Sequence, residues 1–246
     1  MLDGTVALVT GASSGIGEAT ALLLAEEGAA VALAARRTDR LAGLAEKIRD
    51  GGGTALVIES DVSDEAQARA FVGGVAEDLG RLDILVNNAG VMLLGPVHGA
   101  DVEDWRTMVN VNVLGLLYCV HAALPIMEEH GAGDIVNISS VAGRKATAFS
   151  AVYNATKFGV HAFSEALRQE ALNIGVRVTI VAPGFVETEL LTHNPDFVQQ
   201  AAAGQKEEIG QVLAPEDIAD AIVFAVSQPP HVCLNEVLVR PTGQAR

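Results

Sequence analysis

VALVTGASSGIGEA, residues 6–19, passes from a short apolar run through a glycine-rich turn into a helical pattern. Glycine permits backbone torsions that other residues resist, and it lets the chain approach a pyrophosphate closely. A helix that begins directly after such a turn offers free N–H groups and the positive end of its dipole to a phosphate. The spacing is Gly-x-x-x-Gly-x-Gly rather than the usual dinucleotide fingerprint, but the strand, turn and helix around it are the context that the fingerprint requires. We therefore predict a dinucleotide phosphate site here, with a plain tight turn as the alternative.

Short apolar or β-branched runs alternate with longer helical patterns along the whole chain. The runs show little polar alternation, as expected of strands that are covered on both faces. The expected strands are Val6–Val9, Val31–Ala34, Thr54–Glu59, Ile84–Asn87, Asp134–Ser139, Arg177–Val181 and Glu236–Arg240. The expected helices lie near residues 15–28, 39–50, 64–79, 102–130, 151–174 and 215–228, with start signals at Ser63 and Pro215. This order predicts an α/β protein with a single-domain Rossmann fold, in which residues 1–246 form a doubly wound, parallel, seven-stranded sheet with helices on both faces.

One stretch, residues 185–212, lacks a clear pattern and carries Pro195, Gly204 and Gly210 among polar residues. Unstructured stretches of this length are uncommon in compact domains and are usually functional. We predict a lid over the substrate, with a pair of short helices as the alternative.

Composition narrows the range of partners. The chain has 246 residues, is 50% hydrophobic and carries a net charge of −15, so it can bury one large core and is repelled by nucleic acid and by anionic membranes. The N-terminal residues show no signal-peptide pattern and no apolar run looks long enough to span a bilayer, which predicts a cytoplasmic protein. Cys119 and Cys233 are expected to be two buried thiols rather than a disulfide, and the histidines lack the spacing of metal ligands, so no metal is expected.

The residues after the second expected strand bear on the choice of cofactor. A ribose 2′-hydroxyl is usually met by a carboxylate at the end of this strand, whereas a 2′-phosphate is met by guanidinium groups. Ala35 stands where the acid would be, Arg36 and Arg37 follow it, and Asp39 comes only later. This favours NADP(H) over NAD; the alternative for the two arginines is a solvated loop.

Tyr153 and Lys157 lie one helical turn apart, and Ser140 ends the strand-like run that precedes them. A phenol has a pKa of roughly 10, and a nearby ammonium group stabilises the phenolate and lowers that pKa. A hydroxyl from the neighbouring strand can hold a carbonyl oxygen while the phenol exchanges a proton with it. The set predicts carbonyl reduction or alcohol oxidation, although the Tyr–Lys pair by itself also fits an ordinary solvated helix.

Several motifs in a fixed order make the chain resemble the short-chain dehydrogenase/reductase family over essentially its whole length. The motifs are Thr10–Gly17, Asp61-Val62, Asn87-Asn88-Ala89-Gly90, Asn112-Val113-Leu114-Gly115, Ser140, Tyr153 with Lys157, and Pro183-Gly184 followed by Thr188. Many family members end in a glycine-rich segment, whereas this chain ends in Asn235–Gly243. That ending resembles a subgroup of NADP-dependent 3-hydroxy acid and serine dehydrogenases and clavulanate-type aldehyde reductases, and the run Gly90–Pro96 resembles the last of these.

The resemblance implies a role for each motif. Tyr153 would be the general acid and base, Lys157 would lower its pKa and bind the nicotinamide ribose, and Ser140 would orient the carbonyl. Asn112 would hold a water in a proton relay with Lys157. The implied cofactor contacts are Gly11, Ser13, Ser14, Gly15, Ile16 and Gly17 at the phosphates, Arg36 and Arg37 at the 2′-phosphate, Asp61 and Val62 at the adenine, Asn88, Ala89 and Gly90 at the adjoining ribose, and Pro183, Gly184, Val186 and Thr188 at the carboxamide. The substrate would be a small carbonyl compound or alcohol, and the apolar helices at 102–130 and 151–174, with Leu114, Leu117, Val120 and Leu124, would pair in a homodimer or homotetramer.

Other residues allow two interpretations each. Arg144 and Lys145 could attract a substrate carboxylate or lie in a solvated loop. The possible pocket residues, for which core packing is equally open, are Met92, Val141, Phe149 and Phe185. We expect His193 to be exposed, Trp105 and His161 to serve packing, and Glu187 and Glu189 to be non-catalytic. Two other functions also remain open, namely an epimerase or dehydratase, and a non-catalytic NADP-binding sensor or scaffold.

Overall fold

The computed structural model describes residues 1–245, and its centre is one parallel sheet of seven strands in the order β3-β2-β1-β4-β5-β6-β7. The strands are β1 (Val6–Thr10), β2 (Ala30–Ala35), β3 (Ala55–Glu59), β4 (Ile84–Asn87), β5 (Gly133–Ile138), β6 (Val176–Pro183) and β7 (Glu236–Val239). Every predicted strand is confirmed to within two residues at either end. The Rossmann-type α/β fold predicted from the alternation of apolar runs and helical patterns is therefore correct.

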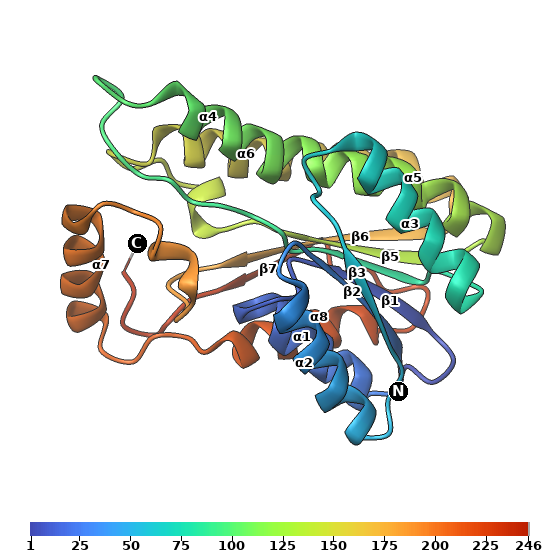
Figure 1. Cartoon of the computed structure of the whole chain (residues 1–246). Helices are drawn as coiled ribbons and strands as arrows, with labels where there is room; N and C mark the ends of the chain where they lie inside the picture. The colour runs from blue at the N-terminus through green and yellow to red at the C-terminus, as the bar shows by residue number, and fades with distance from the viewer. Residues whose placement is uncertain (246) are drawn as a thin grey trace.

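Helices cover both faces of this sheet (Figure 1). On one face lie α1 (Gly15–Glu26), α2 (Thr38–Asp50) and α8 (Pro215–Val226). On the other lie α3 (Glu65–Leu79), α4 (Val102–Val109), the π-helical segment η1 (Asn110–Gly115), α5 (Leu116–His130) and α6 (Ala151–Glu170). The short 3-10 helices are η2 (Val141–Gly143), η3 (Ala171–Ile174) and η4 (Glu189–Leu191), and α7 (Asp196–Ile209) stands beyond the edge of the sheet.

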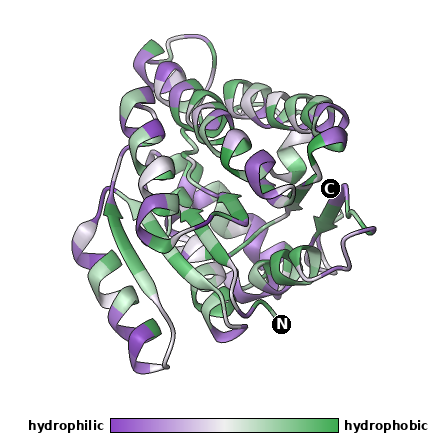
Figure 2. Ribbon diagram, turned by 90° about the vertical axis from the view of Figure 1, so that its right-hand side faces the viewer, coloured by the Kyte–Doolittle hydropathy of each residue, from purple (hydrophilic) through white to green (hydrophobic). Residues whose placement is uncertain are grey.

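The core consists of two apolar layers, one on each face of the sheet. Val9 and Leu33 point into the layer beneath α1, α2 and α8, whereas Leu8, Leu85 and Ile135 point into the layer beneath α3, α5 and α6. Figure 2 shows the strands largely in the hydrophobic colour, while the helices alternate between hydrophobic and hydrophilic residues. Strands that are buried on both faces explain why the sequence shows apolar runs instead of alternation.

The helix starts were predicted with mixed success. Pro215 opens α8 as expected, and the Asp217 carboxylate accepts a hydrogen bond from the Ala214 N–H at 2.8 Å. The start signal at Ser63 was one residue early, because Asp64 is the N-cap of α3 and accepts from the Gln67 N–H at 3.0 Å. Either residue type can cap a helix, so the choice between neighbours depends on the backbone.

The stretch at residues 185–212 is more regular than predicted. It contains the 3-10 helix η4 and the 14-residue helix α7, so the alternative of short helices describes its structure. Figure 1 places α7 beyond the ends of the strands, away from the two helical layers. That this segment closes over a substrate stays a prediction.

The helical stretch from Val102 to His130 differs from expectation in two ways. By length and apolar composition alone it could cross a membrane, so the prediction that no run is long enough was wrong. In the structure this stretch lies across one face of the sheet beside α3 and α6, as Figure 1 shows. It is also not one continuous α-helix, because η1 interrupts it at Asn110–Gly115.

The two cysteines have different environments. Cys119 lies on α5 in the core, where burial raises the pKa of its thiol to about 12. Cys233 is exposed, which corrects the prediction that both thiols are buried. Both are free thiols in the structure.

Two glycines allow the close packing of the first turn of α1 to be tested. A Cβ at Gly17 would lie 2.4 Å from both the Asn88 side-chain nitrogen and the Gly11 carbonyl oxygen, whereas among the described residues a Cβ at Gly73, inside α3, would meet nothing within 4 Å. We expect Gly17→Ala to lower the free energy of unfolding by roughly 1–3 kcal/mol through overpacking. The matched change Gly73→Ala should raise it by roughly 0.5–1 kcal/mol, because alanine favours a helix. Urea unfolding of both variants measures this, and a Gly17→Ala protein as stable as the wild type would contradict the packing argument.

Candidate active site

The predicted site residues gather at the carboxyl edge of the sheet, around the point where the strand order reverses. β1 pairs with β2 on one side and with β4 on the other, so the strand order reverses at β1, and we call the region beyond the carboxyl ends of β1 and β4 the crevice. In open parallel sheets such a switch point is where ligands bind. The glycine turn follows β1, the Asn88–Gly90 segment follows β4, and Ser140 follows β5.

The glycine turn packs tightly against the end of β4. Gly11 has a φ of +64°, and a Cβ there would come within 2.8 Å of the Ala89 Cα. The Asn88 side-chain amide donates to the carbonyl oxygens of Thr10 at 3.0 Å and of Gly11 at 3.2 Å. The Thr10 hydroxyl in turn accepts from the backbone N–H groups of Asn88 and Ala89, both at 3.1 Å. These bonds fix the turn next to the end of β4, directly before the N-terminus of α1, which can bind a phosphate.

The two arginines after β2 have different positions. Arg37 reaches the glycine turn, where its Nε and Nη2 donate to the Ser13 hydroxyl at 3.1 and 2.9 Å and its Nη2 also donates to the Ser14 hydroxyl at 2.6 Å. Arg36 points outward with a side chain that is 72% exposed, 3.9 Å from the Asp61 carboxylate. A guanidinium beside a glycine turn and a helix N-terminus fits a phosphorylated nucleotide, so these residues could hold NADP(H).

Tyr153 and Lys157 share one face of α6 and are both buried, with 7% and 6% of their surface exposed. The Lys157 ammonium lies over the Tyr153 ring, 5.9 Å from its centroid, and donates to the Ile138 carbonyl oxygen at 2.8 Å. Ser140, the N-cap of η2, interacts with the Tyr153 hydroxyl and lowers its pKa, while the Ser140 hydroxyl donates to the Pro183 carbonyl oxygen at 3.4 Å. The Ser140 hydroxyl also accepts from the Ala142 N–H at 3.1 Å, which fixes its direction. The structure therefore brings together the three side chains that the sequence separates.

The pKa values of this pair differ from the sequence-based expectation. Burial raises the pKa of Tyr153 to about 12, and the hydrogen bond with Ser140 offsets only part of that rise. Burial also lowers the pKa of Lys157 to about 8. The expected lowering of the tyrosine pKa by the ammonium is not seen, because desolvation disfavours the charged form of each group.

Asn112 lies in the π-helical segment η1, and its side chain pairs with one backbone unit. Its Oδ1 accepts from the Val91 N–H and its Nδ2 donates to the Val91 carbonyl, both at 2.8 Å. A Cβ at Gly90 would lie 3.4 Å from the Asn112 Oδ1 and 3.9 Å from the Lys157 Nζ. The glycine thus faces both polar groups. π-Helical turns are often found at functional sites, and no local sequence pattern indicated this one.

The remaining predicted cofactor residues form the far wall of the crevice. Thr188 stands beside the glycine turn, since a Cβ at Gly15 would lie 3.1 Å from the Thr188 methyl group. The Thr188 hydroxyl accepts from the Leu190 N–H at 3.4 Å and begins η4. Gly184 donates its N–H to the Val239 carbonyl at 2.7 Å, and Val186 bridges to Leu213. On the opposite wall, Val62 packs against Gly115 of η1.

Asn194 is a residue that the sequence analysis missed. It is buried, although it lies in the segment that precedes α7, and its side chain binds two backbone groups about a hundred positions earlier. Its Oδ1 accepts from the Leu94 N–H at 2.6 Å and its Nδ2 donates to the Met92 carbonyl at 2.8 Å. Asn194 therefore fastens the 185–212 segment to the chain that follows Gly90.

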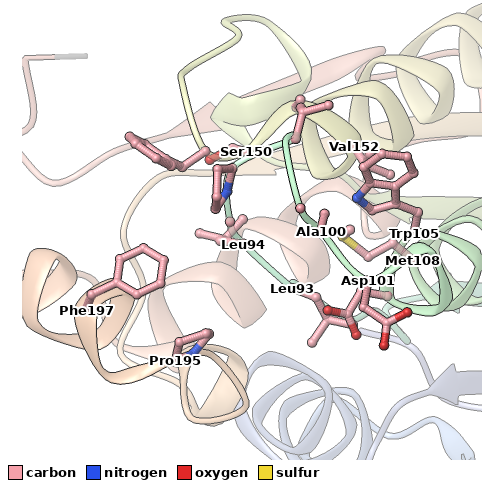
Figure 3. A pocket seen from close by; sticks show the side chains of 17 residues that line it. Leu93, Leu94, Ala100, Asp101, Trp105, Met108, Ser150, Val152, Pro195 and Phe197 are labelled. Carbon is pink, nitrogen blue, oxygen red and sulfur yellow. The ribbon is translucent and has the colours of Figure 1, made fainter.

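A pocket of about 170 Å³ lies next to this connection (Figure 3). Figure 3 shows Trp105 and Met108 on one side and Pro195 and Phe197 on the other, with Leu94 between them. The residues that line it are Leu93, Leu94, Gly95, Pro96, Val97, Gly99, Ala100, Asp101, Asp104, Trp105, Met108, Phe149, Ser150, Ala151, Val152, Pro195 and Phe197. Of the four predicted pocket residues, Phe149 lines this pocket, with a left-handed φ of +65°. Met92, Val141 and Phe185 are partly buried elsewhere.

Several polar candidates can now be placed. Arg144 forms an ion pair with Glu236 on β7, which occupies the guanidinium that was considered for a substrate carboxylate. Lys145 and His193 are exposed. His161 lies against Gly143, consistent with the packing role, and desolvation lowers its pKa. In residues 1–245, no group of three or more His, Cys, Asp or Glu side chains could hold a metal ion.

Known proteins resemble this chain over nearly its whole length. The family model described as short chain dehydrogenase matches residues 5–198. The chain is 44% identical over 243 residues to the glycine betaine reductase ATRR of Emericella nidulans; the match covers 99% of this chain but only 19% of that relative. It is 39% identical over 242 residues to an uncharacterized oxidoreductase of Staphylococcus aureus, with 98% of this chain and 99% of the relative covered. Among solved structures, the closed form of a serine dehydrogenase complexed with NADP+ is similar with a TM-score of 0.91 and 35% identity, covering 98% of this chain and 97% of that one.

The burial of Lys157 predicts a pH dependence of stability. Its pKa is about 8 in the folded chain, against a reference value of 10.5, so between these values the unfolded chain binds more protons. Stability should therefore rise with pH in this window, whereas below pH 8 the burial penalty is nearly complete. From pH 7 to 9.5 we expect the free energy of unfolding of the wild type to rise by about 2 kcal/mol relative to Lys157→Met. Denaturant unfolding across this pH range measures the difference. Lys145→Met replaces an exposed lysine, so its free energy of unfolding should change with pH as that of the wild type does. Parallel plots of this free energy against pH for the wild type and Lys157→Met would contradict the argument.

Proposed function

Since the chain belongs to the short-chain dehydrogenase family, we propose that it interconverts the carbonyl group of a small aldehyde or ketone with the corresponding alcohol, with Tyr153 as general acid and base. The chain is an oxidoreductase that acts on CH–OH groups, and its cofactor is NADP(H). When bound, the nicotinamide supplies or accepts the hydride, and the protein positions and polarises the reacting groups.

The observation that carries the proposal is the burial of the Tyr153 hydroxyl beside Ser140, with the Lys157 ammonium over the same ring. A protonated phenol at neutral pH can donate its proton to a carbonyl oxygen that is becoming an alkoxide. Ser140 is close enough to hold the same oxygen, which would orient the carbonyl carbon. The high pKa of Tyr153 suits the donor role, because the phenol keeps its proton at neutral pH.

Lys157 and Asn112 complete a proton path in this proposal. Both polar groups lie within about 4 Å of the position that a side chain at Gly90 would fill. A water held between these two groups would accept from Lys157 and donate to the Asn112 Oδ1, in keeping with the relay expected from the family resemblance. Lys157, with a pKa of about 8, can hold or release a proton near neutral pH, which suits a group that replenishes the proton of Tyr153.

The cofactor would lie across the crevice from Arg37 to Thr188. On the adenosine side, the 2′-phosphate would contact Arg36 and Arg37, the adenine would contact Asp61 and Val62, and the adjoining ribose would contact Asn88, Ala89 and Gly90. The pyrophosphate would contact the turn residues Gly11, Ser13, Ser14, Gly15, Ile16 and Gly17. On the nicotinamide side, the ribose would contact Tyr153 and Lys157, and the carboxamide would contact Pro183, Gly184, Val186 and Thr188. Since the Asn88 side chain is already engaged by Thr10 and Gly11, its contact to the ribose would come from the backbone. Arg37 supports the phosphate assignment better than Arg36, because only Arg37 reaches the glycine turn.

Similar proteins support a proposal for the substrate class. The similar solved structure is a serine dehydrogenase, and the relative of which the chain spans about a fifth is a glycine betaine reductase. Small polar substrates of this kind, such as 3-hydroxy acids and short aldehydes, are the proposed class. Asn194 would fix the 185–212 segment as a lid above them.

The proposed homodimer or homotetramer would use the exposed part of α4 and α6. Val109 and Phe158 are exposed there, at 40% and 43% of their surface. Of the four residues named from the sequence, Val120 is buried in the core of the chain itself, whereas Leu114, Leu117 and Leu124 are only partly buried. The two alternatives, an epimerase or dehydratase and a non-catalytic sensor, are less well supported, because the chain matches an oxidoreductase family and keeps Ser140, Tyr153 and Lys157 together.

Tyr153→Phe tests the role of the hydroxyl. We expect the variant to lose at least about 100-fold in kcat, because the proton donor is gone. NADPH binding, followed by nicotinamide fluorescence, should stay within about twofold, since the ring that packs beneath Lys157 remains. Turnover close to that of the wild type would refute the acid and base role.

The substrate class is tested by a panel followed at the nicotinamide absorbance band. Serine and 3-hydroxy acids with NADP+, and short aldehydes and ketones with NADPH, should include at least one compound with a kcat/KM of roughly 10⁴ M⁻¹s⁻¹ or more. Tyr153→Phe is the matched control for background reduction. A panel on which the wild type is no better than this variant would contradict the proposed class.

A further inference from the structure

Glu189 joins the beginning of the 185–212 segment to the arginines that follow β2. It is the first residue of η4 and comes directly after Thr188. Its Oε2 accepts from the Arg37 Nη1 at 2.9 Å, and both of its carboxylate oxygens accept from the Arg40 Nη1 at 2.8 Å. The partners are about 150 positions apart in the sequence, so this contact exists only in the folded chain.

Arg37 is shared between this carboxylate and the phosphate turn. Its Nη1 faces Glu189, while its Nε and Nη2 face the hydroxyls of Ser13 and Ser14. A guanidinium binds carboxylates and phosphates in the same forked manner. The carboxylate of Glu189 therefore occupies a direction in which Arg37 would otherwise receive a phosphate oxygen.

Glu189 is an anion at neutral pH. Its hydrogen bonds with Arg37 and then Arg40 hold the pKa of its carboxyl at about 2. A 2′-phosphate placed against Arg37 would bring a second anion beside it, and like charges at such distances repel each other. The two arginines can therefore form their full set of ion pairs with Glu189 or with the phosphate, but not with both.

We propose that Glu189 is an internal substitute for the 2′-phosphate of NADP(H), which pairs with Arg37 and Arg40 in the free protein and is displaced when that phosphate binds. Arg40 is then a further arginine of the phosphate site, in addition to Arg36 and Arg37, which were predicted from the sequence. This inference rests on the proposed placement of the 2′-phosphate at Arg37. It assigns cofactor discrimination to the 185–212 segment, because only a cofactor with a 2′-phosphate can release η4 from the arginines.

The effect of Glu189 on the affinity for NADPH has a sign that follows from thermodynamic linkage. Because Glu189 competes with the phosphate, removing its charge should strengthen NADPH binding and leave NADH, which has no 2′-phosphate, nearly unaffected. The pair is solvent-exposed, with side chains 42% and 45% accessible for Arg37 and Glu189, so the effect should be moderate. We expect about a three- to tenfold change in the dissociation constant of NADPH.

Glu187 offers a matched control on the same segment. It lies two positions before Glu189 and forms an ion pair with Lys206 on α7. Glu187→Gln removes the same charge near the same site, so it measures the general electrostatic effect of making an acidic chain less acidic. The specific effect of Glu189→Gln is its excess over this control.

The experiment titrates NADPH and NADH by nicotinamide fluorescence against the full chain and four variants. Glu189→Gln should tighten NADPH about three- to tenfold and change NADH less than about twofold, while Glu187→Gln changes both less than about twofold. Arg40→Met should weaken NADPH without affecting NADH. If Glu189→Gln fails to exceed Glu187→Gln, the competition is refuted; if Arg37→Met also leaves NADPH binding unchanged, the underlying placement of the 2′-phosphate is wrong as well.

Hydrogen exchange provides a readout that is independent of turnover. Adenosine 2′,5′-bisphosphate carries the 2′-phosphate without the nicotinamide and should speed amide exchange at residues 189–192 in the wild type, whereas 5′-AMP should not. In Glu189→Gln the exchange should be fast from the start and unresponsive to either probe. Equal protection of residues 189–192 by both nucleotides in the wild type would overturn the proposed release of η4.

Discussion

The approach of the glycine turn to the end of β4 is the constraint on which the rest of the site depends. Gly11 and Gly17 leave no room for side chains, and Asn88 ties the carbonyl oxygens after β1 to the segment after β4. Gly90 follows Asn88 and Ala89 directly, and it faces Asn112 and Lys157. The proposed phosphate turn and the proposed proton path thus meet at one junction, at the switch point of the sheet.

Desolvation dominates the electrostatics of the Tyr153–Lys157 pair. Tyr153 and Lys157 are both nearly inaccessible, and burial shifts both pKa values toward the neutral forms. A charged lysine there lowers the stability of the fold, and its hydrogen bond to the Ile138 carbonyl offsets only part of the burial penalty. Such a cost is typical of functional sites, where groups are held in states that folding alone would not select.

Much of the fold and of the site was predictable because it depends on local patterns. Apolar runs identified all seven strands, and the glycine turn, Arg37 and the Tyr153–Lys157 pair follow from residue type and spacing. The π-helical turn at Asn112, the bond of Asn194 to Met92 and Leu94, and the ion pairs of Glu189 depend on contacts between distant segments, which no local pattern encodes. The direction of the tyrosine pKa was missed for a related reason: counting nearby charges ignores burial, which only the fold determines.

The charge balance of the chain gives these distant contacts a common cause. With a net charge of −15, the arginines near the crevice have abundant carboxylates to pair with, and the structure satisfies Arg36 with Asp61 and both Arg37 and Arg40 with Glu189. An anionic cofactor must therefore compete with resident carboxylates rather than enter an open basic site. Because screening weakens exposed ion pairs, salt weakens both the arginine–carboxylate pair and the arginine–phosphate pair. Which of the two anions binds the arginines therefore depends on how well each fits the guanidinium fork. In this proposal, selectivity for the phosphorylated cofactor depends on the displacement of Glu189 as much as on Arg37 and Arg40.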